Sequence, residues 1–361
     1  IELPLWLSIK KLRVQELKLT GAQQLAAQEL SFSLTTSPEQ FELRQLSLAG
    51  LDYALAQGEQ INAEAELSLS NAAPFALQGF VKARSQGVAL NSQISGSLQL
   101  LQLELELTGS QQATAQLEIA PLQRGMPLTL GLKASSLRWP LQGEALYGLQ
   151  DLELDATGSL AKLDVSLKSQ QQLPQLPQSQ LQLKAEWRAP LLSWSSLTLN
   201  STLGTLSSTG TADLAKELAL DTALTFEQLQ LAPWLKDYPG QLSGDIKLKA
   251  SYHQQQWQLE LPTLAIQGQV RQQPLSLSGQ LQAKGKELTV EQLSSKTLVL
   301  QHGANKITAE GQVTDKWQMA LSVVAPDLAS SIQGAQGSLM ADAFVTGPQQ
   351  HPALDIKLQG E

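Results

Sequence analysis

The chain has 361 residues, of which 42% are hydrophobic and only 16% are charged. Its net charge of −8 excludes the basic footprint that nucleic-acid binding requires, so no nucleic acid is expected as a partner. The absence of cysteine excludes a disulfide framework and thiolate chemistry. No apolar run reaches the ~20 residues that span a membrane as a helix.

One pattern recurs along nearly the whole chain: apolar and polar residues alternate over short segments. Examples are AEAELSL at 63–69, LELEL at 103–107, LQLKAEW at 181–187 and ITAEGQV at 307–313. A period of two places all apolar side chains on one face of a β-strand and all polar ones on the other. The alternation therefore predicts a sheet with one continuous apolar face.

The repetition predicts the fold class. At roughly 12 residues per strand and turn, the chain would hold about 30 strands, and open sheets of that size usually curl, split or close. We expect an all-β, elongated, twisted, U-shaped (taco-like) sheet of repeated amphipathic strands with an apolar concave groove.

Irregularities are predicted at four places. The apolar phase changes between Leu98/Leu100 and the run that starts at Leu101, which predicts a β-bulge near Leu100–Leu101. A second irregularity is expected between Leu12/Val14 and Leu17/Leu19. Short helical turns are expected at 232–238 and 326–330, where a proline lies near the possible first turn.

The domain organisation is predicted to be one continuous repetitive array over residues 1–361. A loop rich in glutamine and proline at 170–180 would separate two sub-blocks, 1–169 and 181–361. Because the chain starts without methionine and ends inside an alternating segment, we interpret it as a piece of a longer repetitive protein.

The sequence shows no motif for catalysis, a cofactor or a metal. His253, His302 and His351 are far apart and lie in polar contexts, so solvated loop histidines are expected rather than metal ligands. Phosphate-binding and nucleophile-elbow motifs are absent, and Glu104 and Glu106 alternate with leucine as solvent-facing residues do. A non-enzymatic function is therefore expected.

The tryptophans fall into two groups. Trp187, Trp257 and Trp317 are in phase with the apolar residues, so they are expected to face inward, either as core or in contact with a ligand. The others lie near proline or serine and are expected at edges or turns: Trp6, Trp139, Trp194 and Trp234.

Three structures would cover the apolar face: a second sheet, membrane lipid around a barrel, or acyl chains held in a groove. The chain has few aromatic residues and irregular segment lengths, which disfavours a membrane barrel. An exposed apolar surface of this size is unusual for a soluble protein, which favours an apolar occupant. The residues expected to line a lipid groove are Leu103, Leu105, Leu107, Leu181, Leu183, Trp187, Ile246, Leu248, Trp257, Leu259, Leu261, Leu275, Leu277, Leu281, Ile307, Met319, Leu321 and Val323.

Several phrases in the last third of the chain resemble the TamB family of AsmA-like proteins. They are LAPWL at 231–235, PGQLSG at 239–244, WQLELP at 257–262, GANKI at 303–307, PDLA at 326–329 and VTGP at 345–348, and LRWPL at 137–141 is similar. Their order is more specific than any single phrase.

The resemblance implies a protein that spans the periplasm of a Gram-negative bacterium and is anchored in the inner membrane by a helix outside this sequence. It implies phospholipid acyl chains as ligands, and a TamA-type outer-membrane barrel as a partner through regions also outside it. The expected function is phospholipid transfer between the two membranes through the groove. The alternative is a scaffold that offers its sheet edge to outer-membrane proteins during assembly.

Overall fold

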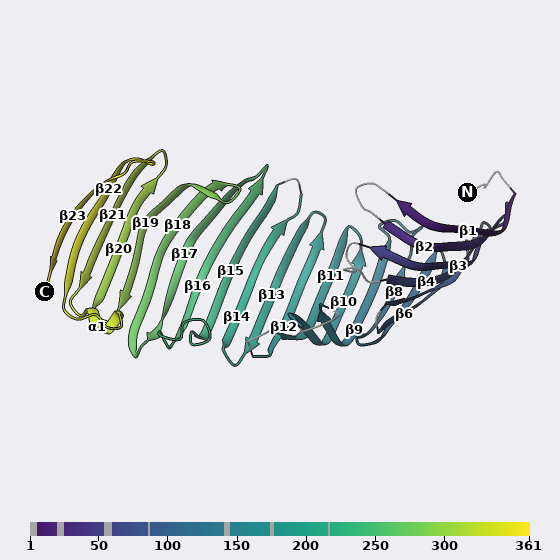
Figure 1. Cartoon of the computed structure of the whole chain (residues 1–361), viewed down its shortest axis with the longest axis horizontal. Helices are drawn as coiled ribbons and strands as arrows, with labels where there is room; N and C mark the ends of the chain where they lie inside the picture. The colour runs from purple at the N-terminus through teal and green to yellow at the C-terminus, as the bar shows by residue number, and fades with distance from the viewer. Residues whose placement is uncertain are drawn as a thin grey trace. The chain divides into compact units, whose positions relative to one another are not determined.

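The structure is a computed structural model that describes residues 6–19, 25–53, 60–85, 87–140, 145–173, 177–215 and 217–361. The chain divides into two compact units, Ile1–Pro174 and Gln175–Glu361. Both are built almost entirely of antiparallel strands, each paired with its neighbours in the sequence (Figure 1). An all-β fold of repeated amphipathic strands is thus confirmed.

The first unit is a sheet of eleven strands in chain order. They are β1 (Leu7–Leu19), β2 (Leu25–Thr36), β3 (Gln40–Tyr53), β4 (Gln60–Ser70), β5 (Leu77–Ser85), β6 (Val88–Ser97), β7 (Leu100–Gly109), β8 (Gln112–Ile119), β9 (Pro127–Trp139), β10 (Tyr147–Ser159) and β11 (Lys162–Gln172).

The second unit has twelve strands and a short helix. They are β12 (Ser179–Arg188), β13 (Leu191–Ser201), β14 (Gly204–Asp213), β15 (Leu218–Gln230), β16 (Gly240–His253), β17 (Gln256–Val270), β18 (Gln273–Lys286), β19 (Thr289–His302), β20 (Asn305–Val313), β21 (Lys316–Ala325), α1 (Leu328–Ser331), β22 (Leu339–Pro348) and β23 (Ala353–Gly360).

Neither sheet closes on itself. Among the described residues, the pairings run only between consecutive strands, from β1–β2 to β10–β11 in the first unit and from β12–β13 to β22–β23 in the second. The connections are mostly tight hairpin turns, which is why strand order follows chain order. Of the predicted loop 170–180, residues 174–176 lie outside the described residues, while β11 ends at Gln172 and β12 begins at Ser179.

The surface area shows how little of the chain is enclosed. The 39.0 kDa chain exposes 22888 Å², whereas two separate globular proteins of half its mass would together expose about 17,000 Å². The buried apolar residues are mostly small, such as Ala134, Ala156 and Ala325. Each unit is therefore a sheet without a thick core.

The predicted bulge at Leu100–Leu101 is wrong. The β6–β7 and β7–β8 pairings keep an unbroken register, with Ser97 opposite Leu100 and Leu101 opposite Ile119. Leu98 lies in the two-residue turn that joins β6 to β7, so the change of phase marks a chain reversal and not an extra residue within a strand. The estimate of about 30 strands was also too high, because many of the 23 strands in the described residues are longer than assumed.

The other local predictions were more accurate. The irregularity between Val14 and Leu17 is confirmed, since Glu16 between them has a φ of 53°. Residues 232–238 form consecutive turns, with the Leu235 amide donating to the Leu231 carbonyl at 2.9 Å. The turn predicted at 326–330 overlaps α1. Within the part of the chain that is described, no helix has the length and hydropathy to cross a membrane.

A glycine pair in the first unit provides a stability test. Gly158 in β10 has a φ of 140°, and a Cβ there would collide with the backbone carbonyl of Lys162, whereas a Cβ on Gly131 in β9 would meet only Asp155 Oδ1 at 3.8 Å. Gly158→Ala is expected to lower the free energy of unfolding by about 1–3 kcal/mol, because it adds both strain and a clash. Urea unfolding followed by circular dichroism measures this, with Gly131→Ala as the control; equal midpoints for the two variants would contradict the expectation.

Candidate functional site

The candidate site is the apolar face of the sheet, and it is built from rows of side chains that cross the strands. Directly opposed residues in an antiparallel pair share one face. In the second unit one such row, here called the central row, passes through all of β12 to β23 without a polar residue: Leu181, Leu199, Leu206, Phe226, Gly244, Ile266, Leu277, Leu300, Ile307, Val323, Ala341 and Leu358.

Two further rows widen this face. The second row is apolar apart from Ser208: Leu183, Leu197, Ser208, Leu224, Ile246, Leu264, Gly279, Leu298, Ala309, Leu321, Ala343 and Ile356. The rim row lies nearer the strand ends and is apolar throughout: Trp187, Leu192, Ala212, Leu220, Ala250, Leu259, Ala283, Leu293, Val313, Trp317 and Gly347.

The register places the predicted groove residues of the second unit on this face. Those outside the three rows share their phase within each strand: Leu248, Trp257, Leu261, Leu275, Leu281 and Met319. Most are half-buried, while Ile307 and Leu321 are 38% and 40% exposed. The face is thus partly shielded by neighbouring side chains and still accessible.

The first unit carries the same construction. One apolar row crosses all of its strands: Ile9, Leu34, Leu43, Leu67, Gly79, Ile94, Leu103, Leu117, Leu130, Ala156 and Val165. The predicted groove residues Leu103, Leu105 and Leu107 lie on this face of β7, and all three are half-buried. Each unit thus has its own apolar face.

Bulges keep the rows continuous in the second unit. Relative to the strands on both sides, an extra residue lies at 195–196 in β13, within 261–263 in β17 and within 295–297 in β19. In β17 the apolar residues change from odd to even positions at this point, from Leu259 and Leu261 to Leu264 and Ile266. The sequence shows this change of phase, and sequence reasoning missed it.

Tryptophans are seated opposite glycines in the second unit. Trp194, Trp257 and Trp317 are the cross-strand partners of Gly210, Gly285 and Gly347. A Cβ on Gly210 or Gly285 would lie 2.5 Å from Cζ2 of its tryptophan, so the indole occupies the space above the glycine. Trp194 was expected at an edge or turn, but it lies within β13 on the apolar face because Gly210 leaves room for it.

The remaining tryptophans agree with their predicted places. Trp139 is the last residue of β9, Trp234 lies in the turn between β15 and β16, and both are exposed, as is Trp6 before β1.

The prediction that His302 is a solvated loop residue is wrong. It ends β19 on the apolar face and is only 8% exposed. Its Nε2 is 2.9 Å from the Val270 carbonyl, and its Nδ1 is 2.8 Å from Ser331 Oγ in α1. Since a carbonyl can only accept, Nε2 carries the proton and donates it. His253 and His351 are exposed, as expected.

Asn305 completes this polar cluster. Its Nδ2 donates to Ser330 Oγ at 3.1 Å and to Ser331 Oγ at 2.6 Å, and its Oδ1 accepts from the Asp327 amide at 3.1 Å. Asn305 is 7% exposed and lies directly opposite His302. The two side chains therefore fasten the segment 326–331 to the apolar face at one end of the strands.

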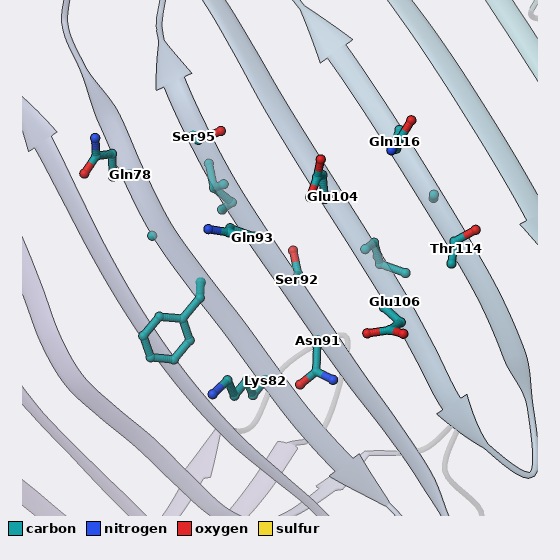
Figure 2. Close-up of a pocket in the computed structure, with 15 residues that line it drawn as sticks. Gln78, Lys82, Asn91, Ser92, Gln93, Ser95, Glu104, Glu106, Thr114 and Gln116 are labelled. Atoms are coloured by element: carbon teal, nitrogen blue, oxygen red, sulfur yellow. The ribbon is translucent and has the colours of Figure 1, made fainter.

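The opposite face of the sheet is polar and solvent-exposed. In the first unit it contains an open hollow of about 1010 Å³ over β5 to β8, which is lined by the side chains of Lys82, Gln93, Glu104 and Gln116 among others (Figure 2). Ion pairs on this face are solvent-exposed, as between Lys249 and Asp221 at 3.4 Å. In the first unit, a hydrogen bond from Arg13 lowers the pKa of Glu29 below its ordinary value.

The described residues include no group of three or more histidine, aspartate or glutamate side chains placed to hold a metal ion. The arrangement presents a broad apolar surface on one side and a polar surface on the other. It defines a class of protein: an unclosed antiparallel sheet of amphipathic strands with a continuous apolar face.

Comparison with known proteins identifies the family. The chain matches the family described as "TamB, N-terminal domain" over residues 1–361, and it belongs to that family. It is 25% identical over 268 residues to the translocation and assembly module subunit TamB of Haemophilus influenzae, which covers 73% of this chain and 20% of the relative. The chain thus spans about a fifth of the length of this relative. No solved structure matches it.

The buried histidine cluster predicts a specific loss of stability. His302→Leu removes both hydrogen bonds and leaves the Val270 carbonyl without that donor, so the free energy of unfolding should fall by about 1–3 kcal/mol. Segment 326–338 should also become more sensitive to a non-specific protease, because α1 loses one of its attachments. His253→Leu is the matched control at an exposed position; the same protease sensitivity in both variants would disprove the role of the cluster.

Proposed function

We propose that this chain is a segment of a periplasmic conduit that carries phospholipids between the inner and outer membranes, with the acyl chains lying on the apolar face. The observation that supports this most directly is the central row, which stays apolar from Leu181 in β12 to Leu358 in β23. At ~4.8 Å between strands, a row of this kind is about 50 Å long. It is long enough for several lipids side by side.

The energetics favour this ligand class. Moving an acyl chain from an apolar surface into water costs about 0.8 kcal/mol of free energy for every methylene group. On a continuous apolar row the chain stays on an apolar surface as it passes from strand to strand, so a lipid can move along the sheet without a large barrier. The head group stays in water, and no covalent step is required.

The family membership is consistent with an envelope function, since the Haemophilus influenzae relative is named as a translocation and assembly module subunit. We propose that the longer family protein works with a TamA-type outer-membrane barrel. In the alternative, the chain is an assembly scaffold that pairs its backbone edge with unfolded strands. Within each unit, however, the strands β2 to β10 and β13 to β22 are already paired on both sides. These strands therefore have no unpaired backbone edge for another strand, and what they present to a ligand is their side-chain face.

Paired photocrosslinking tests the conduit. A photoreactive amino acid at Leu259 should capture phospholipid in cells, because Leu259 lies in the rim row opposite Ala250 and Ala283. The same probe at the next residue, Glu260, should capture none, because it lies on the polar face opposite Lys249. Mass spectrometry of the captured lipid measures both. Lipid at neither position in a folded protein, or equally at both, would contradict the proposal.

A charge on the apolar face should block the conduit. Leu259→Arg places a cation among the acyl chains and should remove most of the phospholipid that copurifies with the chain, whereas Glu260→Arg should not. Leu259→Ala should retain the lipid and cost only about 1 kcal/mol of stability, since it removes a few methylene groups from a half-buried position. Unchanged lipid content in a folded Leu259→Arg variant would argue for the scaffold.

A further inference from the structure

In the second unit, the strand ends on the two sides of the sheet are built differently. One set of strand ends, here called the tryptophan margin, includes the turns at 189–190, 254–255, 287–288, 314–315 and 349–352. The other, the helix margin, consists of the connections at 202–203, 231–239, 271–272, 303–304 and 326–338. Consecutive hairpins alternate between them, so every strand of this unit runs from one margin to the other.

All the tryptophans in the strands of this unit lie near the tryptophan margin. Trp187 is the second-last residue of β12, Trp194 is the fourth of β13, and Trp257 and Trp317 are the second residues of β17 and β21. Among the described residues of this unit, the only other tryptophan is Trp234, which lies in a connection of the helix margin and not on a strand.

Two of the indole N–H groups at this margin are directed toward the turns, whereas that of Trp194 donates to Ser208 Oγ at 3.0 Å. Trp257 Nε1 donates to the Glu287 carbonyl at 3.1 Å, and Trp317 Nε1 donates to the Gln349 carbonyl at 3.2 Å. Both acceptors lie in the next turn along this margin. The polar edge of each of these two indoles therefore faces the strand end, and the ring of Trp257 lies over Gly285 on the apolar face.

At the helix margin, α1 lies over part of the apolar face. There the polar atoms on the apolar face, those of His302 and Asn305, already bond to Val270, Asp327, Ser330 and Ser331. A head group at this place would have to displace α1 or break these bonds. The network instead closes that end of the apolar face over β17 to β21.

Amphipathic aromatic side chains favour the boundary between hydrocarbon and water. We propose that phospholipid head groups lie along the tryptophan margin of the second unit, and that their acyl chains extend along the strands toward the helix margin. This rests on the proposed function and adds the orientation of the ligand and the residues that set it. Trp257 and Trp317 act as positioning residues for the head group.

The dimensions of the face suit this orientation. Along β18 the apolar side chains run from Leu275 near the helix margin to Gly285 near the tryptophan margin. At ~3.4 Å per residue this is about 34 Å. The acyl chains of one leaflet occupy about 15 Å, half the thickness of a bilayer's hydrocarbon core. A tail that starts at the tryptophans therefore ends before it reaches the His302 cluster.

Lipid-borne photoprobes test the orientation in the unmodified chain. Vesicles of phosphatidylethanolamine and phosphatidylglycerol would contain phosphatidylethanolamine with a diazirine either at the head group or at the end of one acyl chain. After irradiation, mass spectrometry maps the labelled residues. Head-group probes should label the turns 254–255, 287–288 and 314–315. Tail probes should label residues about 15 Å along the strands from the tryptophans, such as Leu261 and Leu281.

The outcomes separate this inference from the proposed function. Tail labelling of the apolar face with head-group labelling at the helix margin, or at both margins equally, would overturn the orientation and leave the conduit intact. No labelling of the apolar face by either probe would overturn both.

A variant pair tests the tryptophans themselves. Trp257→Phe combined with Trp317→Phe keeps aromatic rings but removes both indole N–H groups, so head-group labelling should spread from the turns toward the rim row. Trp234→Phe at the opposite margin is the control and should leave the labelling unchanged. A double variant that folds and labels like the parent chain would show that these indoles do not position the head group.

Discussion

The structure depends on one constraint: apolar side chains must meet across every strand pair. A strand that slipped by one residue would present its polar side chains to the apolar face and interrupt the row. The central row shows that this does not happen over β12 to β23, even though the sequence changes phase several times there. Continuity of the row, more than the strength of any single contact, is what makes the face usable by an extended apolar ligand.

Bulges reconcile that constraint with the shape of the sheet. The extra residues in β13, β17 and β19 all lie between the second row and the rim row. A bulge bends its strand and increases the local twist. Bulges at matching places on several strands bend a sheet along a line, and such a bend would produce the trough expected of a taco-like sheet. They also explain how Leu259 and Ile266 share a face although they have opposite parity.

The sequence was sufficient for features that depend only on residue spacing. Alternation alone predicted the β class, the face of each groove residue and the polar nature of the opposite face, because neighbours within a strand decide them. Features that depend on distant partners were missed. His302 was expected in solvent, but it bonds to residues 29 and 32 positions away, and Trp194 is accommodated by a glycine on another strand. The phase change at Leu98 was misassigned because a tight turn and a bulge shift the alternation in the same way.

The two margins show why an open sheet can still be selective about orientation. A face that is apolar from edge to edge would bind acyl chains in either direction, since hydrophobic burial is non-directional. Direction has to come from the strand ends, which differ. At the helix margin, α1 lies over the apolar face, whereas at the other margin the indole N–H groups of Trp257 and Trp317 donate to the turns. Gly285, opposite Trp257, lets that ring lie close to the sheet without obstructing the face. The apolar rows thus determine where the hydrocarbon lies, and the strand ends determine which way it points.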